Sequence, residues 1–104
     1  MRDEGEAVGM GTYEGFAPYL NQTFAVDIGT SSVEMTLVHA TKSQPRDWEG
    51  LRKEPFSLVF KCASPVILPQ RIYPFASAGF GKMDIFIVPV GRDKDGIVYQ
   101  AVFN

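Results

Sequence analysis

Apolar and polar residues alternate with a period of two along much of the chain. Residues 24–28 (FAVDI) and 33–37 (VEMTL) follow this pattern, and a Gly-Thr-Ser-Ser turn separates them. Residues 56–62 (FSLVFKC) alternate in the same way. Because successive side chains of a strand point to opposite faces, the pattern predicts a hairpin followed by a third strand.

The second half of the chain predicts three more strands. They cover residues 71–75, 83–88 and 97–103, and turns that contain glycine separate them. Pro74 cannot donate a hydrogen bond to a neighbouring strand, so we expect its strand to lie at an edge or to bend. About six short strands with almost no helix predict a mostly β fold, a single small antiparallel β-barrel or sandwich.

The N-terminal region lacks this alternation. Residues 1–11 (MRDEGEAVGMG) carry three glycines and no periodic apolar pattern, so we expect a flexible leader. Thr12 is suited to cap one short N-terminal helical turn. The apolar residues that share a face of this turn are Tyr13, Phe16 and Leu20. We expect the turn to plug one end of the barrel, within a single β domain over residues 12–104.

A polar segment, residues 41–55, separates the second and third predicted strands and reads as a long surface loop. Loops of this length are often functional. Trp48 stands among charged residues there, a composition typical of partner-binding hot spots. The alternative is that Trp48 and Leu51 fold back over a barrel end, and the sequence leaves both interpretations open.

Composition narrows the classes of partner. The chain has 104 residues, enough for one domain, and its formal charge of -2 gives no excess of cations for nucleic acid. Cys62 is the only cysteine, so no intrachain disulfide forms and a reducing compartment fits. The longest apolar run, residues 85–90, is too short to span a membrane. We expect synthesis in the cytoplasm, with a later place in an extracellular or particle-associated assembly left open.

Two groups of residues suggest chemistry. Residues 93–96 (DKDG) resemble the opening of a calcium loop, but no later acid supplies the closing ligand, so we predict a hairpin turn without a metal. His39, the only histidine, follows the alternation of Met35 and Leu37 and is expected at the barrel rim. Cys62 continues the alternation of residues 56–60, which predicts a core position. We therefore predict no catalytic residue, no cofactor and no enzyme activity.

Three stretches of the sequence carry a family resemblance. They are Phe56-x-Leu58-x-Phe60, then Leu68-Pro69-Gln70-x-x-Tyr73, then Phe86-x-Val88-Pro89-x-Gly91-x-Asp93-x-x-Gly96-x-x-Tyr99-x-Ala101-Val102-Phe103-Asn104. From about Phe16 onwards the chain resembles a small bacterial β-domain family without an assigned activity. Members are often encoded beside tail-collar-type proteins, including the microcystin-dependent type. The resemblance thus implies association with phage-tail-like fibres.

The last two predicted strands are apolar on both faces. Met83, Ile85 and Ile87 alternate with Phe86 and Val88, and the last strand repeats this pattern. Whichever set fills the core, the other leaves an apolar strip outside, where antiparallel sheets normally carry polar residues. The strip is covered by residues 13–20 or by the Trp48 loop, or else it is a docking surface.

These observations lead to one main hypothesis and two alternatives. The chain is expected to be a non-enzymatic interaction module that binds a tail-collar-type fibre protein or a second copy, but neither nucleic acid nor membrane. The candidate partner-binding residues are Trp48, Leu51, Phe86, Val88, Val98 and Val102. The first alternative is a barrel that binds a small molecule in a cavity lined by Phe24, Met35, Phe60 and Met83. The second is an enzyme with His39 near Cys62 or an acid.

Overall fold

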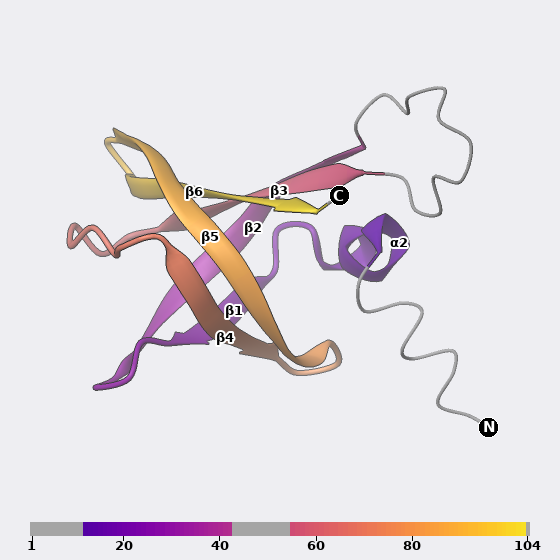
Figure 1. Cartoon of the computed structure of the whole chain (residues 1–104), viewed down its shortest axis with the longest axis horizontal. Coiled ribbons are helices and arrows are strands. Elements are labelled where there is room, and N and C mark those ends of the chain that lie inside the picture. The colour runs from indigo at the N-terminus through magenta and orange to yellow at the C-terminus, as the bar shows by residue number, and fades with distance from the viewer. Residues whose placement is uncertain (1–11, 43–54, 104) are drawn as a thin grey trace.

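A computed structural model describes residues 12–42 and 55–103 of the chain (Figure 1). Within these ranges the elements are α2 (Tyr13–Phe16), the 3-10 helix η1 (Ala17–Tyr19), and the strands β1 (Thr23–Asp27), β2 (Ser32–Lys42), β3 (Phe56–Cys62), β4 (Arg71–Ser77), β5 (Gly81–Asp93) and β6 (Gly96–Phe103). All neighbouring strands are antiparallel. The predicted mostly β fold, with one short helical segment near the N-terminus, is confirmed.

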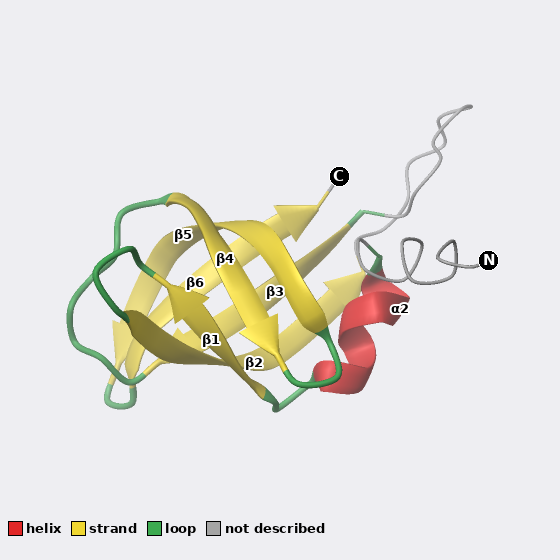
Figure 2. Cartoon of the chain, turned by 90° about the horizontal axis from the view of Figure 1, so that it is seen from below, coloured by secondary structure: helices red, strands yellow, loops and turns green. Residues whose placement is uncertain are grey.

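The strands form one sheet in the order β1-β2-β3-β6-β5-β4, and β1 also pairs with β4, so the order closes on itself. Figure 2 shows the strands wrapped around a common interior. The closure is short, because β1 and β4 pair only at Ala25↔Ala76 and Val26↔Phe75. Pro74 lies next to this pairing and has its register partner, Asp84, on β5. It therefore occupies an edge-like position, as its missing N–H requires.

The predicted strand bounds agree with the structure most closely for β3, which covers residues 56–62. β2 is longer than predicted, because Thr41 and Lys42 belong to it and not to the following loop. The remainder of that loop, residues 43–54 with Trp48 and Leu51, lies outside the described residues. The predicted leader, residues 1–11, lies outside them as well.

The interior is apolar and rich in aromatic rings. β3 shows the pattern clearly, because Phe56, Leu58, Phe60 and Cys62 are buried and the residues between them are partly exposed. Every buried residue of the described chain is hydrophobic. The ring of Phe60 lies 5.9 Å from that of Phe24 and 4.9 Å from that of Phe75, so the aromatic rings pack against one another across the interior.

A β-bulge in β2 corrects the prediction for His39. Leu37 pairs with Phe60 and His39 with Val59, so the register shifts by one residue between them. Such an extra residue turns the following side chains to the other face. His39 is consequently exposed, whereas Met35 and Leu37 are buried. The prediction that all three share a face was wrong, because an alternation read from the sequence does not reveal a bulge.

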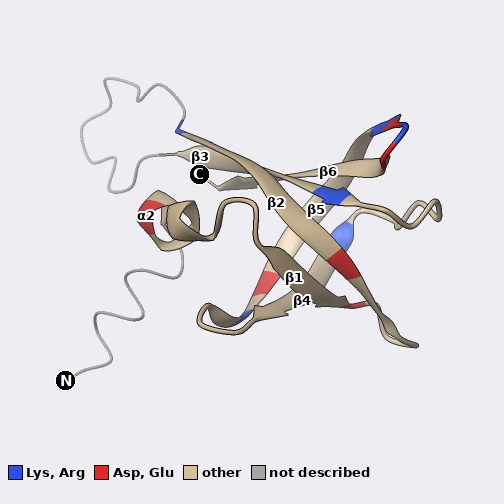
Figure 3. Cartoon of the chain, turned by 180° about the vertical axis from the view of Figure 1, so that it is seen from behind, with Lys and Arg blue, Asp and Glu red and all other residues tan. Residues whose placement is uncertain are grey.

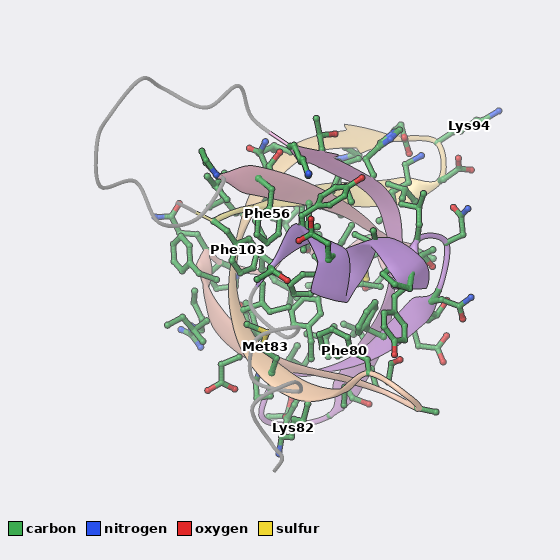
Figure 4. The ribbon with its side chains drawn as sticks, turned by 90° about the vertical axis from the view of Figure 1, so that its right-hand side faces the viewer. Phe56, Phe80, Lys82, Met83, Lys94 and Phe103 are labelled. Carbon is green, nitrogen blue, oxygen red and sulfur yellow. The ribbon has the colours of Figure 1, made fainter. Side chains whose placement is uncertain are left out.

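The helical segment closes one end of the sheet. Thr12 caps α2 as predicted, since its Oγ1 accepts a hydrogen bond from the Gly15 N–H at 3.2 Å. Phe16 is fully buried, and its ring lies 5.1 to 6.0 Å from the rings of Phe56, Phe80 and Phe103. Figure 4 views the molecule from this end. Leu20 departs from the prediction, because η1 ends before it and leaves it 41% exposed.

The loop between β3 and β4 closes the opposite end (Figure 1). Two tyrosines hold it in place. The buried Tyr99 hydroxyl accepts a hydrogen bond from the Leu68 N–H at 3.0 Å, and the Tyr73 hydroxyl donates one to the Pro69 carbonyl at 2.7 Å. The Leu68 side chain is thereby fixed against the core, at 9% exposure.

Candidate functional site

The outward surface of β4, β5, β6 and β3 is unusually apolar. These strands are consecutive neighbours in the sheet. We call their outward apolar side chains the outer apolar face: Val59, Ile72, Pro74, Phe86, Val88, Val90, Val98 and Val102. The strands present this face because each buries its alternate residues in the core and leaves the other set outside.

The strand register makes the outer apolar face continuous. Ile72 on β4 is the register partner of Phe86 on β5. Gln100 on β6 is the partner of both Val88 on β5 and Val59 on β3. Directly opposed residues in antiparallel strands have Cβ atoms about 5 Å apart. The apolar residues therefore form one patch across four strands, with Gln100 as a polar residue near its centre.

Exposure distinguishes two groups within this face. Ile72 is 59% exposed, Phe86 50%, Val90 53% and Val102 58%. The other members, Val59, Pro74, Val88 and Val98, are partly buried. Of the two covering segments that the sequence left open, residues 13–20 pack at the end of the sheet, where Phe16 lies against Phe56, Phe80 and Phe103. The Trp48 loop lies outside the described residues.

The sequence had identified half of this surface. Phe86, Val88, Val98 and Val102 were predicted candidates, and all four lie on the outer apolar face. Val59 was missed because only the strand order brings β3 next to β6. Ile72 and Pro74 join the face through the pairing of β4 with β5, and Val90 was missed because β5 continues beyond residue 88, where its predicted strand ended. Trp48 and Leu51, the remaining candidates, lie outside the described residues.

Charged residues border this face. Asp84 lies at one end, opposite Pro74, and His39 is the register partner of Val59 at one side. Lys61 is the partner of Val98. Other charges gather at the tip of the β5–β6 hairpin, as Figure 3 shows. The eight residues of the outer apolar face are uncharged. A partner therefore needs no complementary charges opposite them.

The β5–β6 hairpin forms the tight turn that the sequence predicts. Asp93 pairs with Gly96, and the Asp93 Oδ1 accepts a hydrogen bond from the Asp95 N–H at 2.8 Å. The Lys61 ammonium lies 2.8 Å from an Asp93 carboxylate oxygen and 3.6 Å from one of Asp95. The hydrogen bond between Lys61 and Asp93 holds the pKa of Asp93 below its ordinary value of 3.8 and raises the pKa of Lys61 above 10.5.

A shallow pocket of about 190 Å³ lies between this hairpin and residues Ala63 and Pro65. Its lining mixes both charge signs, with Arg92 and Lys94 beside two aspartates. Within residues 12–42 and 55–103, no three His, Cys, Asp or Glu side chains are grouped as metal ligands would be. That the hairpin binds no metal stays a prediction.

Cys62 and His39 are not brought together. Cys62 is 2% exposed and faces the interior, as predicted, whereas His39 is exposed on the outer surface. The two side chains therefore lie on opposite faces of the sheet. This arrangement does not supply the contact that a cysteine nucleophile and its histidine base require.

The chain belongs to the family described as a domain of unknown function (DUF6916), whose model matches residues 11–103. This confirms the resemblance to an uncharacterised domain family. Comparison with curated proteins and with solved structures found no match. In the described part of the chain, no helix combines the length and hydropathy that a membrane span requires.

Proposed function

We propose that this chain is a non-enzymatic docking module whose outer apolar face binds a protein partner. The observation that carries the proposal is the exposure of Ile72, Phe86, Val90 and Val102 on adjoining strands. An antiparallel sheet that faces water normally carries polar residues on that side. Here the solvent-facing side offers apolar groups, whose transfer out of water is favourable.

The size of the face supports a binding role. Half of a branched or aromatic side chain amounts to about 100 Å² of accessible surface, so the four most exposed residues supply about 400 Å². The largest apolar patch on a typical monomer has about this size and is often functional. Removing 400 Å² from water contributes about 10 kcal/mol before the costs of association are subtracted.

The resemblance to a family that is often encoded beside tail-collar-type proteins supports a place in a fibre-like assembly. An uncharged apolar face on a small domain suits a role in assembly or capping. We therefore propose a fibre-like assembly as the setting, with a tail-collar-type fibre protein as a candidate partner.

The residues expected to line a cavity in the alternative, a small-molecule-binding barrel, pack closely in the interior. Phe24, Met35 and Phe60 are fully buried, and Met83 packs against the same core. Phe24 and Phe60 are within ring-contact distance of each other and of Phe75. We therefore favour the docking proposal, and the small-molecule-binding barrel stays an alternative.

Affinity capture with matched variants tests the docking function. The wild type, Phe86→Lys and Val66→Lys are used as baits against lysate of the source cells. Val66 is 65% exposed but lies in the β3–β4 loop, outside the outer apolar face. We expect a protein retained by the wild type and by Val66→Lys to be lost from Phe86→Lys. Equal retention by all three baits would refute docking through this face.

A further inference from the structure

We infer that the occupant of the outer apolar face is a second copy of this chain, which packs sheet against sheet in a symmetric dimer. This inference rests on the proposed function, because it requires the face to be a docking surface.

The chemistry of the face suits self-contact. In a two-fold dimer the same patch meets itself, so a charge near the two-fold axis approaches its own copy. None of the eight residues of the outer apolar face is charged, and Gln100 near its centre can both donate and accept hydrogen bonds. The nearest acid, Asp84, lies at the end of the face and not within it. Lys61 and His39 also border the face, and the Lys61 ammonium is paired with Asp93. Repulsion between like charges of the two copies is therefore confined to the border of the face.

The shape of the face also suits a second copy. Sheets pack face to face at about 10 Å, with side chains of the two surfaces interdigitated. Phe86 is the largest side chain of the face and is 50% exposed, so it can insert between the smaller valines of an opposing face. One such contact covers two apolar faces at once, and neither remains in water.

The area predicts a weak dimer. Including the partly buried members, the face presents about 500 Å² of apolar surface, so two copies bury about 1,000 Å² in total. Stable interfaces begin at about 1,200 Å², and weaker complexes lie below that area. We therefore expect a dissociation constant that is micromolar or weaker, on the order of 10⁻⁶ to 10⁻⁴ M.

Sedimentation velocity of the full chain, from about 1 to about 300 μM, tests the inference. We expect the average mass to rise towards twice that of the monomer. Phe86→Lys and Val102→Lys are each expected to weaken association about tenfold or more. Val66→Lys, which places the same charge at an exposed valine elsewhere, is expected to leave association unchanged.

Thermal melts at low protein concentration distinguish a failure of the dimer from a failure of docking through the outer apolar face. If the wild type stays monomeric while Phe86→Lys keeps its melting temperature, the dimer is refuted and docking on a different protein stands. If Phe86→Lys and Val102→Lys lose stability as core substitutions do, both proposals fall. If Val66→Lys weakens association as much as Val102→Lys does, the dimer forms through another surface and the inference is wrong.

Discussion

Gly96 provides the sharpest test of the local geometry. Its φ of +134° lies in a region that residues with a side chain rarely adopt. A Cβ at this position would overlap the Cys62 carbonyl oxygen and lie 2.9 Å from the Ala63 Cα. These are backbone atoms at the end of β3, so they cannot swing aside as a flexible side chain does. We therefore expect Gly96→Ala to be strongly destabilising.

The magnitude follows from two contributions. A backbone held in a strained region costs about 1–3 kcal/mol, and forced overpacking costs about 1–3 kcal/mol more. Gly96→Ala should thus lower the free energy of unfolding by about 4 kcal/mol, which lowers the melting temperature by about 15–30 °C in a domain of this size. Gly29→Ala is the matched control, because Gly29 has a φ of +98° with no atom within 4 Å of the added Cβ. It should cost only the backbone strain.

Urea unfolding followed by far-UV circular dichroism measures both variants. The difference between them isolates the contact of residue 96 with the end of β3. If Gly96→Ala and Gly29→Ala lose equal stability, the close approach is not present and the reasoning is wrong.

Three further predictions concern the core, the tyrosine-held loop and the charged hairpin. Phe16→Ala should lower the free energy of unfolding by about 3–5 kcal/mol in urea, because a buried ring is lost; a loss below 1 kcal/mol would contradict the plug. Tyr99→Phe should cost about 1–3 kcal/mol, since the buried Leu68 N–H loses its acceptor, and an unchanged urea midpoint would argue against that bond. The lowered pKa of Asp93 stabilises the fold above pH 3.8, and this stability is lost as the pH falls. The raised pKa of Tyr99 stabilises the fold below pH 10.0, and this stability is lost as the pH rises. Thermal melts at a series of pH values test both statements. Asp93→Asn should reduce the dependence of the melting temperature on pH in acid, and Tyr99→Phe should reduce it in alkali.

The alternation of residues predicted the strands because burial on one face imposes a period of two. It gave β3 its correct bounds and placed Cys62 in the core. It failed at His39, because a bulge adds one residue without leaving a mark in the pattern. The hydrogen bond from Leu68 to Tyr99 was equally hidden, since it joins residues 31 positions apart.

The candidate site was likewise predicted only in part. That β5 and β6 would be apolar on both faces was visible in the sequence. That Val59 extends the same surface depends on β6 lying between β3 and β5, and an alternation carries no information on strand order. The need for glycine at position 96 arises from atoms of residues 62 and 63, so it required the structure as well.

The position of β6 has a consequence for synthesis on the ribosome. Among the described strands β6 is last in the sequence, yet it lies between β3 and β5. Before residues 96–103 leave the exit tunnel, β1–β2–β3 and β4–β5 are two separate pieces that share only the two residue pairs of β1 and β4. Each piece then presents an open strand edge, which promotes association between nascent chains. Both edges are covered once β6 pairs with β3 and β5.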